Sequence, residues 1–182
     1  MLFTGTSEHT LDAKLRLAIP AKYRNQWNPE RDGGAWFCVP WPGGPEGSES
    51  SLSGKHLRIY TEAAFGRLAD QLPATLAPNP TQADFDASFF GYAERLETDS
   101  AGRLQLPKVH VQLAALGTEV VVVGARTHLE VRDRDQWLRN TAARFEALPR
   151  LAAKIDAGSD GEEDEKAKKK RQELISLRCK FL

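Results

Sequence analysis

Cysteine is scarce in this chain of 182 residues, which contains only Cys38 and Cys179. Two cysteines so far apart along the sequence argue against a disulfide framework and against a zinc site built on thiolates. Cys38 stands between Phe37 and Val39, so we expect a buried thiol in the core. The chain is therefore expected to be a globular protein of a reducing compartment.

Charge of one sign and long apolar runs are also absent. The sequence has 25 Lys and Arg against 25 Asp and Glu, so binding to nucleic acid or to a membrane must depend on a local patch. No apolar run approaches the roughly 20 residues that span a bilayer, and the first residues lack the pattern of a secretory signal. These absences predict a cytoplasmic protein without a membrane partner. A hydrophobic content of 41% is enough to form a core.

Motifs of catalysis and metal binding are missing as well. The four histidines, at positions 9, 56, 110 and 128, have no spacing that places two of them on one helical face. No glycine-rich phosphate loop, nucleophile elbow or His-Glu metal helix is present. We expect no enzyme, no cofactor, no metal and no small-molecule substrate. His56 and His128 are expected to share a structural position, because they recur in the repeat described next.

What the sequence does contain is an internal repeat. Residues 12–20 read DAKLRLAIP and residues 99–107 read DSAGRLQLP, so Asp, Arg, Leu and Pro recur at an offset of 87. Residues 56–60, HLRIY, match residues 128–132, HLEVR, at an offset of 72. The first copy therefore carries about 15 additional residues. Residues 40–54, PWPGGPEGSESSLSG, have the composition of a mobile surface loop and account for them.

The repeat predicts two similar halves, 1–72 and 94–148. Between them lies a linker and connecting segment, 73–93, which contains three prolines. In each half, alternating apolar residues predict short strands, and a helical pattern follows them over 62–72 or 133–148.

A charged tail, 149–182, follows the second half. Pro149 should break or kink the chain at its start. Acids precede bases by four positions between residues 162 and 171, which favours a helix. An apolar stripe then recurs at helical spacing: Leu174, Leu177 and Phe181. Three interpretations remain open: the stripe docks onto a neighbouring subunit or the chain's own barrel, the tail stays disordered, or its bases at 168–171 contact DNA non-specifically despite the preceding acids.

Each copy of the repeat begins with an aspartate four residues before an arginine. Leu17 must face the core, so its neighbour Arg16 must face away from it. The same alternation turns Arg103 outward. Asp12 and Asp99 precede the strands, where an aspartate either holds the turn by accepting backbone N–H bonds or pairs with its arginine.

The first copy is also locally basic. Between residues 9 and 24 the only acid is Asp12, and four bases accompany it: Lys14, Arg16, Lys22 and Arg24. Between residues 94 and 110, three bases meet three acids. The first copy is therefore the better candidate for a surface that faces a polyanion, and an ordinary solvated strand face is the alternative.

These residues carry a resemblance to a known family. Residues 9–24, HTLDAKLRLAIPAKYR, resemble the first block of the MraZ family of bacterial transcriptional regulators, and residues 99–107 resemble its second. Residues 120–124, VVVVG, with 129–131 and Trp137, resemble the end of the second repeat. Two tandem Asp-x-x-x-Arg matches, each followed by an aliphatic residue and Pro, are specific where one would not be.

The resemblance implies a mainly β fold with flanking helices. That fold is a tandem AbrB-like (SpoVT/AbrB) swapped-hairpin β-barrel, in which one chain supplies both pseudo-symmetric halves. It also implies sequence-specific DNA binding, repression from repeated promoter boxes upstream of division and cell-wall genes, ring-shaped homo-oligomers and a place at the nucleoid. By motif position, the DNA-facing role falls on Lys14 and Arg16 and then on Arg103, with Lys22 and Arg24 as further bases.

The chain departs from the family at Leu15, where a glycine usually precedes the first arginine, whereas Gly102 is kept. If this position needs a positive φ, Leu15 is strained or the first turn takes another shape. The alternative function is an oligomeric protein-interaction module on the same fold that has lost DNA recognition. Leu15 and the zero net charge favour it, whereas Lys14, Arg16 and Arg103 oppose it.

Overall fold

The computed structural model describes residues 1–43, 54–73 and 75–156. The predictions made for 44–53 and for 157–182, including the apolar stripe and Cys179, lie outside the described residues. The chain divides into two units, 1–140 and 141–182, and each is treated by itself.

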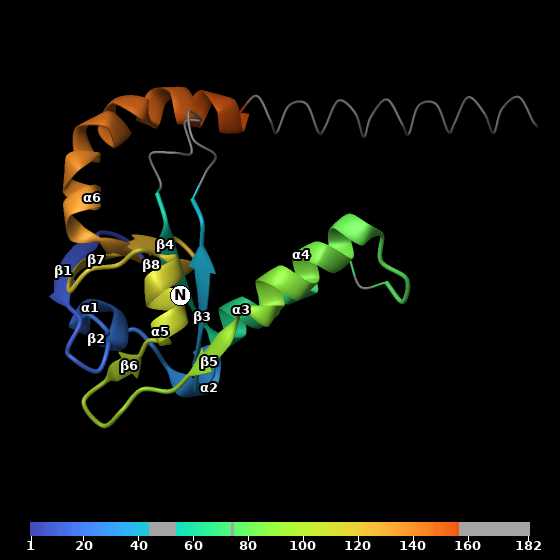
Figure 1. Ribbon diagram of the computed structural model, residues 1–182, viewed down its shortest axis with the longest axis horizontal. Helices are drawn as coiled ribbons and strands as arrows, with labels where there is room; N and C mark the ends of the chain where they lie inside the picture. The colour runs from blue at the N-terminus through green and yellow to red at the C-terminus, as the bar shows by residue number, and fades with distance from the viewer. Residues whose placement is uncertain (44–53, 74, 157–182) are drawn as a thin grey trace, which may run out of the picture. The chain divides into compact units, whose positions relative to one another are not determined.

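The first unit is built on a six-stranded sheet with the strand order β1-β7-β8-β4-β3-β5 (Figure 1). All its pairings are antiparallel. Its strands, in that order, are Thr6–Thr10, Glu119–Ala125, His128–Asp133, His56–Thr61, Trp36–Trp41 and Glu94–Leu96. A separate ribbon pairs β2, Arg16–Ala18, with β6, Arg103–Gln105. The mainly β class with helices matches the prediction, and the described strands form open sheets.

The two halves of the repeat exchange strands within the large sheet. β1 of the first half pairs with β7 of the second, and β5 of the second pairs with β3 of the first. The hairpins β3–β4 and β7–β8 meet along β4 and β8, with Arg58 opposite Glu130. These two residues are equivalent in the sequence repeat. Leu17 and Leu104, which are also equivalent in it, face each other across β2 and β6.

Alternation along the strands divides the core in two. The larger cluster includes Leu17, Leu57, Leu104 and Leu129, and it extends from the inner face of the large sheet to the β2–β6 ribbon. Cys38 lies fully buried in this cluster, as predicted, and burial raises the pKa of its thiol. A smaller aromatic cluster gathers on β3, β4, α3 and α4: Val39, Tyr60, Phe65 and Phe89.

Helices connect the strands of the first unit. In chain order they are α1 Ala21–Arg24, α2 Pro29–Asp32, α3 Glu62–Asp70, α4 Pro80–Gly91, α5 Lys108–Leu113 and α6 Arg134–Arg139. None of the described helices is long and apolar enough to cross a membrane.

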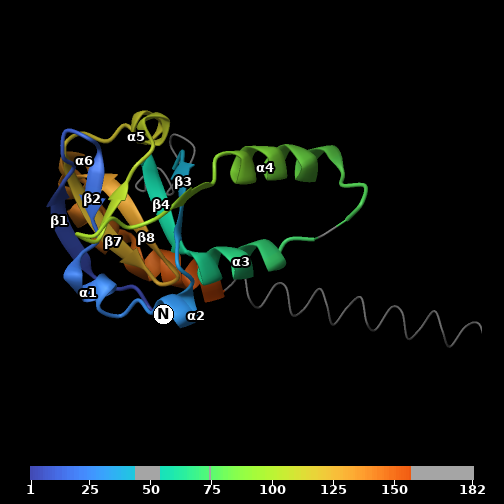
Figure 2. The same cartoon turned by 90° about the horizontal axis from the view of Figure 1, so that it is seen from below.

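Two segments differ from the prediction. The segment expected to be a linker contains α4, because Asn79 caps its first turn and Pro80 occupies a first-turn position that needs no N–H donor. Figure 2 shows α3 and α4 extending from the same side of the sheet, and the rings of Phe65 and Phe89 stack 6.0 Å apart. Pro40 and Trp41, expected in the insertion loop, belong to β3 and pair with Leu57 and His56.

The helical prediction after β8 needs a correction. α6 ends at Arg139 and Asn140 forms a turn, so the interruption falls before residue 141. Residues 141–156 of the second unit are helical, and Pro149 lies inside this helix. A break at Pro149 is wrong, because residues 141–156 are helical on both sides of it, and a kink at Pro149 stays a prediction.

Candidate nucleic-acid interface

The two Asp-x-x-x-Arg segments form tight turns with the same backbone. The N–H of Leu15 donates to the carbonyl of Asp12 at 2.8 Å, and the N–H of Gly102 donates to that of Asp99 at 2.8 Å. Leu15 has φ 58° and Gly102 has φ 71°. The first turn therefore keeps the shape of the second, and Leu15 adopts a left-handed conformation that costs a side-chain-bearing residue about 1–2 kcal/mol. Its side chain packs against the core.

Each aspartate holds its own turn. Asp12 Oδ1 accepts the backbone N–H groups of Lys14 at 2.9 Å and of Arg16 at 3.0 Å. Asp99 Oδ1 accepts those of Ala101 at 2.9 Å and Arg103 at 3.0 Å. The other carboxylate oxygen of each aspartate accepts the Nε–H of its arginine, at 2.7 Å in the first turn and 2.8 Å in the second. One carboxylate thus fixes both the turn and the guanidinium.

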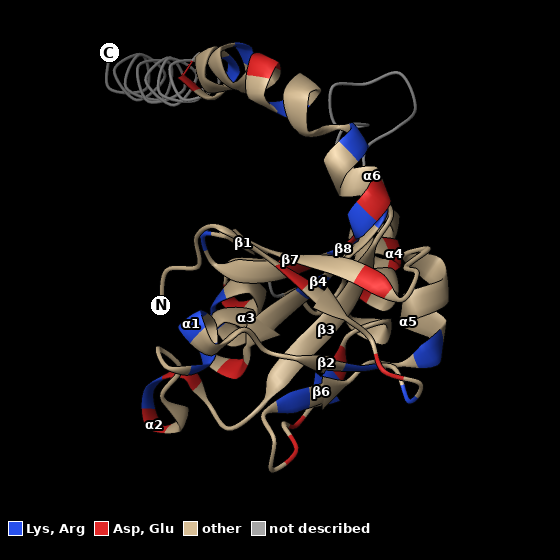
Figure 3. Cartoon of the chain, turned by 90° about the vertical axis from the view of Figure 1, so that its left-hand side faces the viewer, with Lys and Arg blue, Asp and Glu red and all other residues tan. Residues whose placement is uncertain are grey.

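The pairing of β2 with β6 brings the two turns side by side. Arg16 Nη1 lies 3.9 Å from Asp99 Oδ2, and Arg103 Nη1 lies 3.9 Å from Asp12 Oδ2. We call this ring of four alternating charges the Asp–Arg quartet. Its side chains are 28–35% exposed, so it lies at the surface, where Figure 3 shows basic β2 and β6 beside acidic turns.

The quartet is fully ionised at neutral pH and has no net charge. The backbone N–H of Arg16 is the main cause that lowers the pKa of Asp12. The Arg103 side chain and backbone N–H lower the pKa of Asp99 to about 2, and Asp99 in turn raises the pKa of Arg103. Because the four charges cancel, any excess of positive charge must come from bases beside the quartet.

Two such bases flank the turns. Lys14 is exposed in the first turn. Arg24, at the end of α1, reaches across to the second turn, where its Nη1 lies 3.5 Å from the carbonyl of Ala101. A Cβ atom at Gly102 would come within 2.8 Å of the Arg24 side chain. The first turn therefore carries its own base, and the second turn, which has alanine at that position, takes one from the other half.

The fifth predicted base lies elsewhere. Lys22 Nζ donates to the carbonyl of Thr6 at 2.9 Å and lies 4.6 Å from the ring centroid of Tyr23. It therefore points toward β1 and away from the quartet. Conversely, sequence reasoning missed Gln105, whose Nε2 donates to the carbonyl of Lys14 and joins β6 to the first turn. Nothing in the repeat indicates this contact, because the equivalent residue of the first copy is Ala18.

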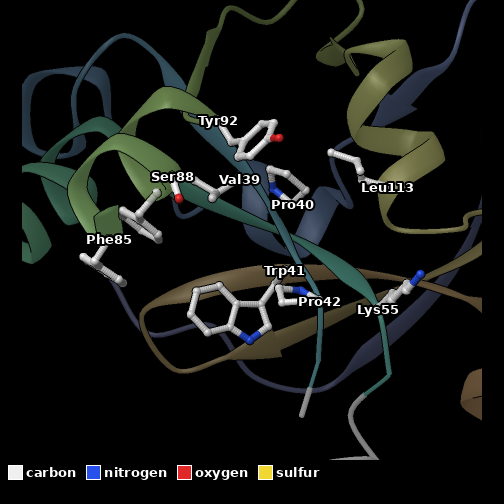
Figure 4. Close-up of a pocket in the computed structure, with 10 residues that line it drawn as sticks. Val39, Pro40, Trp41, Pro42, Lys55, Phe85, Ser88, Tyr92 and Leu113 are labelled. Atoms are coloured by element: carbon white, nitrogen blue, oxygen red, sulfur yellow. The ribbon is translucent and has the colours of Figure 1, made fainter. Parts of the chain in front are cut away.

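Other candidate sites lie apart from the quartet. The described residues contain no group of three His, Cys, Asp or Glu side chains arranged to hold a metal ion. An apolar cavity of about 450 Å³ lies between β3, α4 and α5, with Trp41, Phe85, Tyr92 and Leu113 among its lining residues (Figure 4). The quartet with Lys14 and Arg24 is thus the best candidate for binding a polyanion.

Comparison with known proteins gives a consistent match. The family described as "MraZ protein, putative antitoxin-like" matches residues 2–33 and 89–153, which leaves out the region of the insertion. A protein of Chromobacterium violaceum named "Transcriptional regulator MraZ" is 35% identical over 138 residues, covering 76% of this chain and 85% of the relative. Relatives of the same name are 32% identical in Limosilactobacillus fermentum, covering 85% and 97%, and 29% identical in Moorella thermoacetica, covering 85% and 99%.

Proposed function

The chain belongs to the MraZ family of transcriptional regulators, and from this premise we propose that it binds double-stranded DNA through the Asp–Arg quartet and its flanking bases. The observation that carries the proposal is the quartet itself. It presents the same fixed Asp–Arg pair twice on one ribbon, with all four side chains partly exposed. An arginine oriented through its Nε–H can offer its remaining N–H groups to the edge of a guanine.

The quartet supplies specificity and the flanking bases supply attraction. Because the quartet is neutral, Lys14 and Arg24 are the groups that neutralise phosphates, whereas Arg16 and Arg103 read base edges. Two phosphate contacts give one protomer only a low affinity for DNA. A homo-oligomeric ring repeats the interface, so that several weak contacts act together on repeated promoter boxes.

The same proposal covers the fold and the regulatory role. The exchange of β1 and β5 between the two hairpins supports a tandem AbrB-like swapped-hairpin barrel, with one chain supplying both halves. Under this proposal the chain acts at the nucleoid as a repressor of division and cell-wall genes. We propose no catalytic activity for it. The alternative is an interaction module that has lost DNA recognition.

The salt dependence of DNA binding tests the proposal against the alternative. The upstream DNA of the chain's own gene is titrated at several salt concentrations, beside a shuffled sequence of equal composition. We expect tighter binding to the upstream DNA and a steep loss of affinity with salt. Lys14→Ala should weaken both DNAs and reduce the logarithmic salt slope by about one for each site occupied. Arg67→Ala, at an exposed base of α3, is the matched control. Weak, sequence-independent binding by the wild type would favour the interaction module.

A further inference from the structure

A second polar cluster lies where the two halves meet along β4 and β8. Alternation with the buried leucines and valines places six side chains on the face of the sheet opposite the larger core. From β4 they are His56, Arg58 and Tyr60, and from β8 they are His128, Glu130 and Arg132. His56 is only 1% exposed and Arg132 5%, so their hydrogen bonds decide the stability of this face.

Glu130 is the anion at the centre of the cluster. Its Oε2 accepts two bonds from Arg132, at 2.8 and 2.6 Å. Its Oε1 lies 3.4 Å from His56 Nε2 and 3.5 Å from His128 Nε2. Burial by itself would raise the pKa of Glu130, but the two histidines and Arg132 outweigh it and hold that pKa below its ordinary value. Glu130 therefore stays a carboxylate and accepts any N–H that is offered.

No single protonation state of His56 satisfies both of the groups that face its Nε2 atom. Its Nδ1 lies 2.9 Å from the carbonyl of Gly54, which only accepts, so Nδ1 carries a proton. Its Nε2 lies 3.4 Å from the Nε–H of Arg58, which requires a lone pair on Nε2. The same Nε2 lies 3.4 Å from Glu130, which requires a proton there. The neutral ring satisfies Arg58, and the imidazolium satisfies Glu130.

Arg58 has several partners on this face, and the phenol of Tyr60 is one of them. Strand register places it directly opposite Glu130. Its guanidinium carbon nevertheless lies 3.7 Å from the ring centroid of Trp41, as a cation–π pair. Trp41 in turn lines the apolar cavity between β3 and α4 (Figure 4). The bond from Arg58 to neutral His56 thus helps to hold the guanidinium against the ring of Trp41, which lines this cavity.

We propose that His56 is a proton switch at the junction of the two halves. Neutral His56 accepts from Arg58 and keeps the guanidinium on Trp41. Protonated His56 donates to Glu130, repels the guanidinium and releases it from Trp41. Imidazole is the side chain that gains a proton between pH 8 and 5, so mild acidification would change the contact of Arg58 with Trp41, a residue that lines the cavity.

The groups that face His56 support this direction. The charged or titratable ones are Arg58 and Tyr60 on its own strand and His128, Glu130 and Arg132 on β8. Burial raises the pKa of Tyr60, so the phenol stays neutral throughout the range. The other residues that contact this network in the described chain include Gly54, Trp41, Thr127 and Trp137, which are uncharged. Lys55, next to His56 in the sequence, lines the cavity together with Trp41. Among the titratable groups, His56 is the one whose ring nitrogen contacts both Arg58 and Glu130.

His128 provides a matched control. It occupies the equivalent position in the second half and approaches the same Glu130 oxygen. Its ring stacks on Tyr60 with the centroids 4.7 Å apart, and its Nδ1 lies 3.2 Å from Thr127 Oγ1. No contact with Arg58 or Trp41 is found for it in the described structure. A change at His128 should therefore leave the contact between Arg58 and Trp41 in place.

Nitrogen NMR of the full chain between pH 8 and 5 tests the switch. We expect His56 to carry its proton on Nδ1 at high pH and on both nitrogens at low pH. The Nε–H signal of Arg58 and the indole N–H signal of Trp41 should shift with the same midpoint. His56→Gln should abolish both shifts, and His128→Gln should leave them in place.

Three results would overturn the switch. One is an Nε2–H tautomer of neutral His56, and another is a Trp41 shift that survives His56→Gln. The third is a Trp41 shift that disappears in His128→Gln. If His56→Gln does not fold, the wild-type titration still decides, because the tautomer and the coincidence of the midpoints are read without the variant. DNA binding is not involved in any of these measurements.

Discussion

Leu15 and Gly102 share one left-handed backbone conformation but have different surroundings. Leu15 packs its side chain against the core, which offsets part of its conformational cost. Gly102 lies beneath the Arg24 side chain and has no room for a Cβ atom unless that side chain moves. The two turns therefore differ. Leu15 gives the first turn an apolar contact with the core, and Gly102 leaves room for Arg24 beside the second turn.

Gly102→Ala should therefore act on stability and on DNA in different ways. The free energy of unfolding should fall by about 1–2 kcal/mol, because alanine is strained at this φ. The exposed Arg24 side chain should swing away, so affinity for DNA should fall by about as much as in Arg24→Ala. In the double variant the two losses of affinity should not add. Urea unfolding and DNA titration of the four proteins check this, and additive losses would show that Arg24 acts independently of the turn.

Acid should weaken the quartet over a defined range. The folded pKa of Asp99 is about 2, below its ordinary value, so its stabilising effect is complete above about pH 4. That effect is lost as the pH falls toward 2. The unfolding free energy of the wild type should therefore drop more steeply between pH 5 and 2 than that of Asp99→Asn. Parallel curves in urea titrations at several pH values would contradict this role for Asp99.

At the scale of the element, the sequence predicts strand faces better than strand partners. Period-two alternation correctly predicted that Leu17 faces the core and Arg16 faces away from it. Such alternation arises whenever one face of a strand is buried. The order of strands in the sheet depends on which half supplies each neighbour, and no local pattern contains that information. For the same reason the approach of Arg24 to the second turn, across 77 positions of sequence, could not be predicted.

The missed helix α4 has a different cause. Its first residues lie among prolines, which usually punctuate loops. Pro80 fits because the first turn of a helix leaves its N–H groups unpaired, and Asn79 accepts the N–H of Gln82 at 2.9 Å. The composition of the segment indicated a linker, whereas the position of one proline within it permitted a helix.

The ends of the insertion suggest how short the β3–β4 connection can become. A Cβ at Gly43 would lie 2.6 Å from the carbonyl oxygen of Gly54, and both glycines have positive φ. Trp41 pairs with His56 at the end of the ladder, so deleting 44–53 leaves a four-residue connection, 42–43 and 54–55, with two glycines at its centre, where Gly-Gly is suited to a tight turn.

We expect the variant without 44–53 to fold. Its unfolding free energy should stay within about 1 kcal/mol of the wild type, since loop length contributes little to stability. Urea unfolding monitored by circular dichroism measures this. A variant that is insoluble, or that loses its cooperative transition, would show that the removed residues support the sheet.

At the scale of the whole molecule, the neutral charge of the chain bears on the proposed binding of DNA. With Lys14 and Arg24 as the two bases beside a neutral quartet, one protomer has little non-specific attraction for DNA. Under the proposal, specific binding at physiological salt therefore needs several protomers on one DNA. The proposed ring and the proposed repeated boxes therefore depend on each other, because several protomers can act together only on a DNA that has several boxes.

The number of boxes should consequently control affinity. DNA with two or more adjacent boxes should bind about 10²-fold more tightly than DNA with one box at the same protein concentration. Moving the boxes apart by half a helical turn should remove most of this gain, because the protomers then face opposite sides of the duplex. Fluorescence anisotropy with the three DNAs measures it, and equal affinity for one box and two would exclude avidity.

Arg16→Ala is the most direct test of whether the Asp–Arg quartet reads DNA. The measurement is affinity for the upstream DNA relative to shuffled DNA, with urea unfolding to verify folding and Arg67→Ala as the control. We expect a loss of about 1–3 kcal/mol per contact for the upstream DNA, with specificity relaxed at one base position and stability nearly unchanged. Unchanged affinity and preference in a folded Arg16→Ala protein would contradict the assignment.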